Sequence, residues 1–173
     1  MNQYDNLSDY YFKLFKKRIK FIKGTNSIIL NFLKNKKINK VIIEASSHGL
    51  DQKRLHHIKF NGAIFTNFSQ DHLDYHKTMR SYLNSKLILF RKILSKKSTI
   101  ISNDEIPTFK ILSQIAKKKN FKILNIKKTL KKINNIDLKL KEDFKIRNLA
   151  MAIEAAKLCG LKEKFIFNSL KKL

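Results

Sequence analysis

The chain has 173 residues, of which 38 are Lys or Arg and 13 are Asp or Glu, so its formal net charge is +25. A single Cys excludes a disulfide-stabilised scaffold, and no apolar run reaches the ~18 residues that a membrane-spanning helix requires. We therefore expect one soluble, cytoplasmic protein with no membrane partner.

The positive charge is spread along the chain rather than gathered in one segment. Lysine supplies 33 of the 38 basic residues, and the remaining composition favours Ile, Asn, Phe and Leu. A/T-rich codons encode these residues, so biased base composition explains the charge more simply than selection for a polyanion-binding surface does. A nucleic-acid partner is therefore not expected, and a basic nucleic-acid-binding module is kept as the alternative function.

Apolar periodicity predicts helices that alternate with strands. The first elements are a helix over 27–36, a strand over 41–45 (VIIEA) and a strand over 62–67 (GAIFTN). A long helix over 78–94 follows, because its apolar residues form one stripe. The later elements are a strand over 98–102, a helix over 107–119 opened by Pro107, a strand over 121–126, a polar loop or edge over 127–135, and helices over 145–159 and 162–172 separated by a capping Gly160.

Strands and helices in this order predict an α/β fold, with a mostly parallel sheet flanked by helices on both faces. Ligands bind such sheets beyond the carboxyl ends of the strands. The polar segments that follow the strands over 41–45 and 62–67 are therefore the first candidates for a functional site.

The first polar segment is EASSHGLDQKR, which begins at Glu44. A carboxylate at the end of a strand is suited to Mg²⁺, a hard cation that prefers oxygen ligands. Gln52 and Arg54 offer an amide and a bidentate guanidinium to an anionic or amide-rich substrate. The alternative is a solvated loop in which Ser46 caps a short helix and Arg54 pairs with Asp51.

The second polar segment is TNFSQDHLDYH, which begins at Thr66 and is dense in His and Asp. Neutral imidazoles such as those of His72 and His76 are common metal ligands. The pattern is not that of a zinc site, because no Cys accompanies the two histidines. The alternative is a polar turn in which Asp71 caps the start of a helix.

Lys86 lies on the predicted helix over 78–94, about one turn from Tyr82 and Phe90 and therefore close to the apolar stripe. A lysine in this position usually extends its ammonium group to water, because burial of an unpaired charge is costly. Spacing alone therefore favours a structural role for Lys86.

The two segments together, EASSHGLDQKR and FTNFSQDHLDYHKTMRSYLNSK, resemble the central domain of the Mur ligases. The resemblance runs from Val41 to Phe90 and resumes at FKIRNLAMAIEAAKLCGL, residues 144–161. It implies an incomplete P-loop-type fold, with 1–24 as an irregular N-terminal remnant and 25–173 as a partial Mur ligase central domain.

The family joins an amine to a carboxylate with ATP and Mg²⁺, through an acyl phosphate. The resemblance is greatest to the branch that adds the third amino acid to UDP-N-acetylmuramoyl-L-alanyl-D-glutamate in peptidoglycan synthesis. It therefore implies an ATP-dependent ligase whose partners are this UDP-N-acetylmuramoyl-dipeptide and an amino acid. A folylpolyglutamate synthase of the same superfamily is a less close alternative.

The resemblance also implies roles for individual residues. Glu44, His72 and Lys86 correspond to magnesium ligands, and His72 and Lys86 are also expected to be catalytic. Lys86 corresponds to a lysine that CO₂ carbamylates, which turns a cation into an anionic oxygen ligand and removes the cost of burying the amine. The implied substrate-binding residues are Thr25, Ser46, Gln52 and Arg54, and the implied nucleotide-binding residue, near the adenine, is Asn148.

The sequence departs from the family in one motif and in its extent. Its four glycines form no G-x-x-G-K-[ST] loop, the motif whose backbone amides and lysine bind ATP phosphates. The family's N-terminal and C-terminal domains are not recognised either. We therefore expect a fragment that is inactive alone, or a split enzyme completed by a separate chain, with a non-catalytic remnant of the fold as the alternative.

Overall fold

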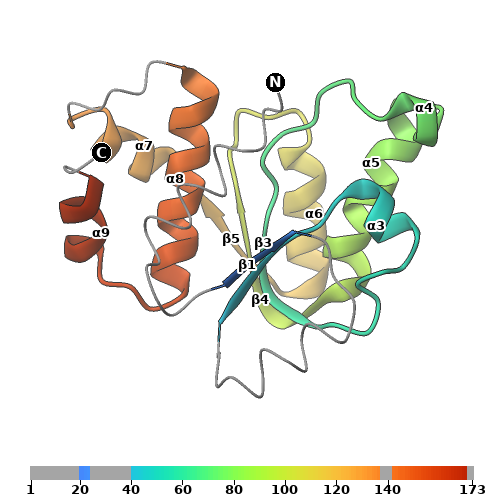
Figure 1. The fold of residues 1–173 in the computed structure, drawn as a ribbon, viewed down its shortest axis with the longest axis horizontal. Coiled ribbons are helices and arrows are strands. Elements are labelled where there is room, and N and C mark those ends of the chain that lie inside the picture. The colour runs from blue at the N-terminus through green and yellow to red at the C-terminus, as the bar shows by residue number, and fades with distance from the viewer. Residues whose placement is uncertain (1–19, 24–39, 137–141, 171–173) are drawn as a thin grey trace.

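The computed structural model describes residues 20–23, 40–136 and 142–170 (Figure 1). The predicted helix over 27–36 and Thr25 lie outside the described residues. The strands are β1 (Lys20–Lys23), β2 (Val41–Glu44), β3 (Phe60–Ile64), β4 (Leu94–Ser102) and β5 (Lys122–Asn125). The helices are α3 (Ser47–Asp51), α4 (Leu73–His76), α5 (Met79–Ile88), the π-helical turn η1 (Leu89–Ile93), α6 (Phe109–Lys119), α7 (Lys127–Ile133), α8 (Asp143–Leu158) and α9 (Glu163–Leu170).

Every strand pairing among the described residues is parallel. β1 pairs with β2, and β3, β4 and β5 form a three-stranded sheet with β4 in the centre. Ile100 and Ile101 of β4 are both fully buried, although adjacent side chains on a strand face opposite sides. Burial on both faces is typical of a parallel sheet covered by helices, so the predicted α/β fold is confirmed.

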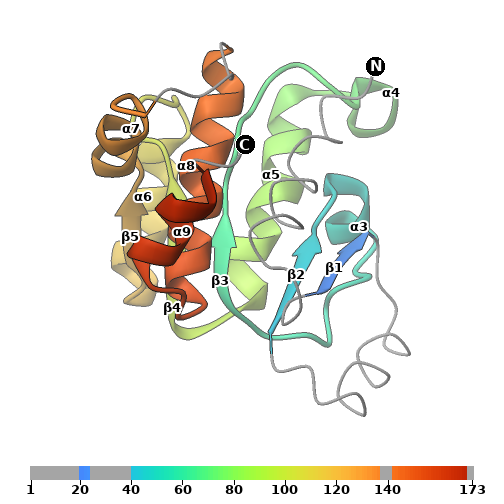
Figure 2. The same cartoon turned by 60° about the vertical axis from the view of Figure 1, so that its left-hand side comes forward.

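Helices cover the two faces of the three-stranded sheet (Figures 1 and 2). On one face, Ile101 belongs to a buried cluster with Leu149 of α8. On the other face, Ile100 belongs to a cluster with Phe90 of η1 and Leu112 of α6. The two isoleucines of β4 therefore connect the central strand to both helical layers.

β2 is hydrogen-bonded to β1 rather than to β3, yet its side chains join the same layers. Ile42 packs against the cluster that contains α8. Ile43 packs against a third cluster, formed by Leu50, Leu55 and Ile93. β2 therefore lies in the strand layer, between α8 on one side and α3 with η1 on the other.

The prediction of a polar loop or edge over 127–135 is wrong, because residues Lys127–Ile133 form helix α7. Thr129 and Ile133 are buried on α8, and the Thr129 hydroxyl donates a hydrogen bond to the carboxylate of Glu154. This helix is amphipathic but short, and most of its residues are lysines. Its inward-facing residues are too few for the sequence pattern to indicate a helix.

The other predicted boundaries differ by a few residues. α6 begins at Phe109, so Pro107 precedes the helix instead of opening it. The predicted helix over 78–94 consists of α5 and η1, and Leu94 already belongs to β4. The last two helices are confirmed, and Gly160 between them has φ of +88°, a conformation that favours glycine.

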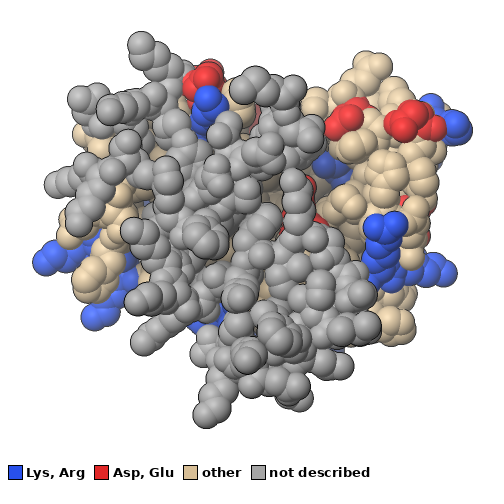
Figure 3. Space-filling view, viewed as in Figure 1, with Lys and Arg blue, Asp and Glu red and all other residues tan. Residues whose placement is uncertain are grey.

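The described basic side chains do not form a single patch on the visible surface (Figure 3), and the described helices are not of a membrane-spanning type. On the face drawn in Figure 3, the described Lys and Arg side chains occur in several separate places rather than in one patch, in agreement with their spread along the sequence. Within the described ranges, no helix combines the length and the apolar character that a bilayer span would need.

Gly62 of β3 is a site where the packing leaves no room for a side chain. A Cβ atom at Gly62 would lie 2.8 Å from Leu158 Cδ2 and 3.1 Å from the Thr99 carbonyl oxygen of β4. We expect Gly62→Ala to lower the free energy of unfolding by about 1–3 kcal/mol, as overpacking usually does. Urea denaturation measures this change.

The double variant Gly62→Ala, Leu158→Ala provides the control. Leu158 is 45 % exposed, so its truncation alone should cost little, and it removes the nearer of the two contacts. We expect the double variant to recover part of the lost stability. A Gly62→Ala protein with the parental urea midpoint would contradict this account of the β3–α8 packing.

Candidate functional site

The two polar segments meet at α5. α3, which contains part of the first segment, and α4, which contains part of the second, both pack on α5. Figure 1 shows α3 and α4 on the same side of the molecule, next to α5. The chain therefore brings together two segments that follow different strands, as a parallel sheet requires.

The first segment turns sharply into α3 at Ser46. The Ser46 Oγ accepts a hydrogen bond of 3.1 Å from the backbone N of Gly49. A Cβ at Gly49 would lie 3.1 Å from this oxygen, so the missing side chain allows the turn to close tightly. Ser46 is thus a helix cap that is exposed to solvent, and Gln52 and Arg54 are exposed just beyond the helix end. Their substrate-binding roles stay predictions.

His72, the predicted metal ligand, directly precedes α4 as its N-cap residue and has a left-handed backbone conformation with φ of 55° and ψ of 28°. Residues other than glycine rarely adopt this conformation. Asp71 stabilises it in two ways, since its Oδ1 accepts a 2.8 Å hydrogen bond from the His72 backbone N and its Oδ2 lies 3.3 Å from the His72 Nε2. Asp71 therefore fixes both the backbone and the imidazole of His72.

Three imidazole rings gather between α3 and α4. The His48 ring centroid lies 4.9 Å from that of His72 and 5.3 Å from that of His76. His76 is buried, its Nε2 lies 2.9 Å from the Ser47 Oγ, and its ring stacks on Tyr82 at 5.2 Å. Burial lowers the pKa of His76, and the neighbouring His48 lowers it further. His76 thus connects α3, α4 and α5.

Lys86 lies on the side of α5 that faces aromatic rings. Its Nζ is 4.9 Å from the Tyr82 ring centroid and 5.9 Å from that of Phe65. Burial lowers the pKa of Lys86, although the negative charge of Asp71 acts in the opposite direction. His72 contacts the same Tyr82 ring edge-on, with centroids 5.8 Å apart. The structure therefore brings His72 and Lys86 together around Tyr82.

The third predicted metal ligand, Glu44, is half-buried at the end of β2. Among the described residues, no group of three or more His, Cys, Asp or Glu side chains is arranged to bind a metal ion. The convergence of Glu44 with His72 and Lys86 stays a prediction.

Asn148, the predicted adenine-binding residue, is not part of this cluster. It is half-buried on α8, and α8 packs on the opposite face of the central sheet from η1, which continues α5. Its proposed role is therefore separate from that of the histidines and also stays a prediction.

Sequence analysis did not assign a role to Tyr75 or Ser85, which bind Asp51 in the structure. The Tyr75 hydroxyl donates to Asp51 Oδ2 at 3.0 Å, and the Ser85 hydroxyl donates to Oδ1 at 3.4 Å. The suggested Arg54–Asp51 ion pair is absent from the ion pairs of the described residues, and the carboxylate of Asp51 instead accepts these two hydrogen bonds. The sequence feature that could have drawn attention to Tyr75 is the segment HLDYH, in which Tyr75 lies next to His76 on the same helical turn.

Comparison with known proteins agrees with the geometry. The Mur ligase middle domain model matches residues 23–158. A UDP-N-acetylmuramoyl-L-alanyl-D-glutamate--2,6-diaminopimelate ligase from Wigglesworthia glossinidia brevipalpis is 44% identical over 126 residues, which cover 69% of this chain and 25% of that protein. A protein of the same name from Aquifex aeolicus is 38% identical over 148 residues, which cover 76% of this chain and 30% of that protein. The chain thus spans about a quarter of the length of these curated relatives.

Solved structures show the same fold. A structure of a UDP-N-acetylmuramoyl-L-alanyl-D-glutamate--2,6-diaminopimelate ligase superposes with a TM-score of 0.78 at 22% identity, over 99% of this chain and 44% of that one. MurF from Acinetobacter baumannii superposes with a TM-score of 0.67 at 11% identity, over 95% of this chain and 42% of the MurF chain. At these identities the likeness shows the fold alone.

The lowered pKa of His76 gives a testable dependence of stability on pH. Folded His76 has a pKa below its ordinary value of 6.5, so the unfolded chain binds more protons at this residue as the pH falls through that value. The free energy of unfolding should therefore decrease between about pH 7 and about pH 5. We expect His76→Gln to lower stability at neutral pH by about 1–3 kcal/mol, because Ser47 loses its partner, and to make the pH dependence shallower.

Urea denaturation at a series of pH values measures both effects. His57→Gln is the matched control, because it removes an exposed imidazole and should leave the pH dependence as it is in the parent. An equally steep pH dependence in the parent and in His76→Gln would contradict the assignment to His76.

Proposed function

The chain belongs to the Mur ligase family, whose middle-domain model it matches over residues 23–158, and from this premise we propose that it is part of an ATP-dependent ligase. The proposed reaction adds the third amino acid to UDP-N-acetylmuramoyl-L-alanyl-D-glutamate in peptidoglycan synthesis. The names of the relatives specify 2,6-diaminopimelate, which we propose as the added amino acid. A cytoplasmic location is part of the same proposal.

The observation that supports this function best is the grouping of His72 and Lys86 around Tyr82. Both side chains contact this buried ring, and Asp71 fixes the orientation of the His72 imidazole. We propose that Glu44, His72 and Lys86 bind Mg²⁺, with Lys86 as a carbamate. When bound, Mg²⁺ would offset the negative charge of the ATP phosphates as the substrate carboxylate is phosphorylated to an acyl phosphate.

The surroundings of Lys86 favour its reaction with CO₂. Only a neutral amine can form the new N–C bond, and a proton leaves the nitrogen as the carbamate anion forms. Burial lowers the pKa of Lys86 and so increases the fraction of neutral amine at a given pH. The two aromatic rings beside the Nζ keep water from part of the amine, which explains the burial. The lowered pKa of Lys86 and its position beside Tyr82, which His72 also contacts, support this proposal.

The exposed residues around α3 suit an anionic substrate. Ser46 uses an oxygen lone pair to cap the helix, so its hydroxyl hydrogen is left to donate to a ligand. Arg54 is exposed beyond α3 and can bind a carboxylate or a phosphate through two parallel hydrogen bonds. We propose that Ser46, Gln52 and Arg54 bind the UDP-N-acetylmuramoyl-dipeptide, with Thr25, and that Asn148 contacts the adenine of ATP.

The residues that bind the ATP phosphates are the part of the site that this sequence does not supply. It contains no Gly-Lys-Ser or Gly-Lys-Thr. In the proposed ligase, a phosphate-binding loop therefore comes from further sequence or from a separate chain.

The carbamate can be tested on the chain itself. We expect ¹³C-labelled bicarbonate to give a carbamate carbon signal in the NMR spectrum of the purified chain, strengthened by Mg²⁺. Lys86→Arg should remove this signal, because a guanidinium does not react with CO₂, whereas Lys117→Arg, at an exposed position on α6, should keep it. A signal that persists in Lys86→Arg would show that another amine reacts.

The ligase activity can be tested in a longer ligase that carries this segment together with a phosphate-binding loop. Lys86→Ala should reduce ligation by about 100-fold or more, as the loss of a positioned catalytic charge usually does, and short-chain carboxylic acids should restore part of the activity. The purified chain alone should release no phosphate from ATP in the presence of the dipeptide substrate and diaminopimelate. Phosphate release by the chain alone, or full activity of Lys86→Ala, would refute the proposal.

A further inference from the structure

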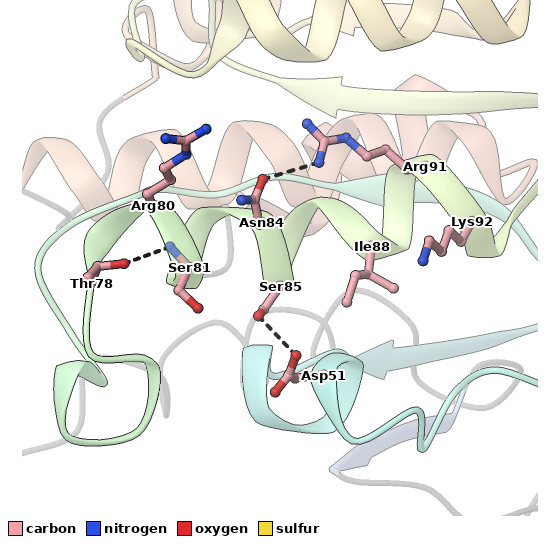
Figure 4. Close-up of a pocket in the computed structure, with 9 residues that line it drawn as sticks. All are labelled: Asp51, Thr78, Arg80, Ser81, Asn84, Ser85, Ile88, Arg91 and Lys92. Carbon is pink, nitrogen blue, oxygen red and sulfur yellow. Dashed lines mark hydrogen bonds between the residues drawn. The ribbon is translucent and has the colours of Figure 1, made fainter.

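A shallow pocket of about 480 Å³ lies along α5 and η1 (Figure 4). Eight of its nine lining residues lie between Thr78 and Lys92, and the ninth is Asp51 of α3. Three of them, Arg80, Arg91 and Lys92, are cationic. At about 100° per residue, Lys86 points roughly 160° away from Asn84 around the helix axis, so Asn84 lies on the other side of α5 from Lys86.

The two arginines of the pocket are placed on either side of Asn84. The Arg91 guanidinium reaches back along the helix and donates a hydrogen bond of 3.2 Å to the Asn84 Oδ1. Arg80 stands one turn before Asn84, and Figure 4 shows both guanidinium groups on the same side of the helix. The hydrogen bond to Asn84 uses only one of the five N–H donors of Arg91, so most donors of both groups remain available.

The positive charges of this pocket are not neutralised by ion pairs with the described residues. Within the part of the chain that the structure describes, no ion pair involves Arg80, Arg91 or Lys92. Asp51, the one carboxylate among the described lining residues, accepts hydrogen bonds from Tyr75 and Ser85, and Figure 4 shows it on the opposite side of α5 from the two guanidinium groups. An anion bound between the guanidinium groups would therefore meet cations that form no ion pair with the described residues.

The choice of arginine is itself informative in this chain. Arginine supplies only five of the 38 basic residues, and two of these five line one pocket. Biased base composition explains the lysines but not the clustering of the few arginines. The guanidinium is a planar fork that matches the oxygen atoms of a phosphate, whereas lysine offers a point charge.

We propose that Arg80, Asn84 and Arg91 form a binding site for a phosphate-type oxyanion, either free phosphate or the phosphate group of a monoester. The site is distinct from the proposed ligase site, because it uses none of the proposed substrate, nucleotide or metal residues. It adds a second place on α5 where an anionic ligand binds.

The five arginines make this site easy to observe. Their side-chain Nε–H groups give at most five signals in a ¹H–¹⁵N spectrum of the labelled full chain, so Arg80 and Arg91 can be assigned with two substitutions. Inorganic phosphate and methyl phosphate serve as probes, each compared with sodium chloride at equal ionic strength in a phosphate-free buffer. We expect a saturable shift of the Arg80 and Arg91 signals with phosphate and none of comparable size with chloride, while Arg147 on α8 is the internal reference.

Matched variants separate the specific site from general attraction by a basic protein. Arg91→Lys keeps the charge but removes the fork, so we expect binding about ten-fold weaker, and Asn84→Ala should weaken binding by releasing Arg91. Lys117→Gln, which removes one exposed charge from α6, should bind as the parent does. These lining arginines are exposed, so the variants should fold.

The outcomes are unambiguous. Saturation by both probes indicates a site for phosphate monoesters, and saturation by inorganic phosphate alone indicates a site for the free ion. Equal shifts with chloride, or undiminished binding in Arg80→Gln, Arg91→Gln, would overturn the proposal. Because the readout requires neither ATP nor ligation, it is independent of the proposed ligase function.

Discussion

The buried ring of Tyr82 is the contact on which the arrangement of the polar residues depends. It is 2 % exposed and touches Phe68, His72, His76 and Lys86, which come from the second polar segment and from α5 itself. An aromatic ring can stack on an imidazole, meet another edge-on and lie beneath an ammonium group at once, because its faces and its edge carry opposite partial charges. One side chain is thus contacted by both the predicted metal ligand and the predicted site of carbamylation.

Two buried polar side chains, those of His76 and Glu154, have hydrogen-bonded partners. His76 is paired with Ser47, and the Glu154 carboxylate on α8 accepts from Thr129 and lies 2.6 Å from the Lys157 Nζ. The His76–Ser47 and Thr129–Glu154 contacts join different elements, whereas Lys157 is one turn from Glu154 on α8. Each partner offsets the free energy that an unpaired buried polar group would cost. Burial also lowers the pKa of Lys86, and the charge of Asp71 opposes that shift.

α5 has a different chemical character on each of its sides. Its inner side carries Tyr82 and Leu87 into the core, with Lys86 beside them, and its outer side carries Arg80 and Asn84, continued by Arg91. A helix that follows a strand in an α/β fold must bury one stripe against the sheet, while the opposite stripe is free to vary. Two of the five arginines lie on that outer stripe, where packing against the sheet does not dictate the residue.

The sequence by itself determined the α/β fold, the order of most strands and helices, and the family, because β-branched runs, helical periodicity and two long motifs are local features. It also placed Glu44, His72 and Lys86 as candidates through their family resemblance. Only the tertiary structure decided that His72 and Lys86 share the Tyr82 ring, that Asp51 binds Tyr75 and Ser85 instead of Arg54, and that the lysine-rich segment 127–133 is a helix against α8. These outcomes depend on contacts between residues far apart in the chain, and local propensity carries no information about which distant side chain completes a hydrogen bond or covers a short apolar stripe.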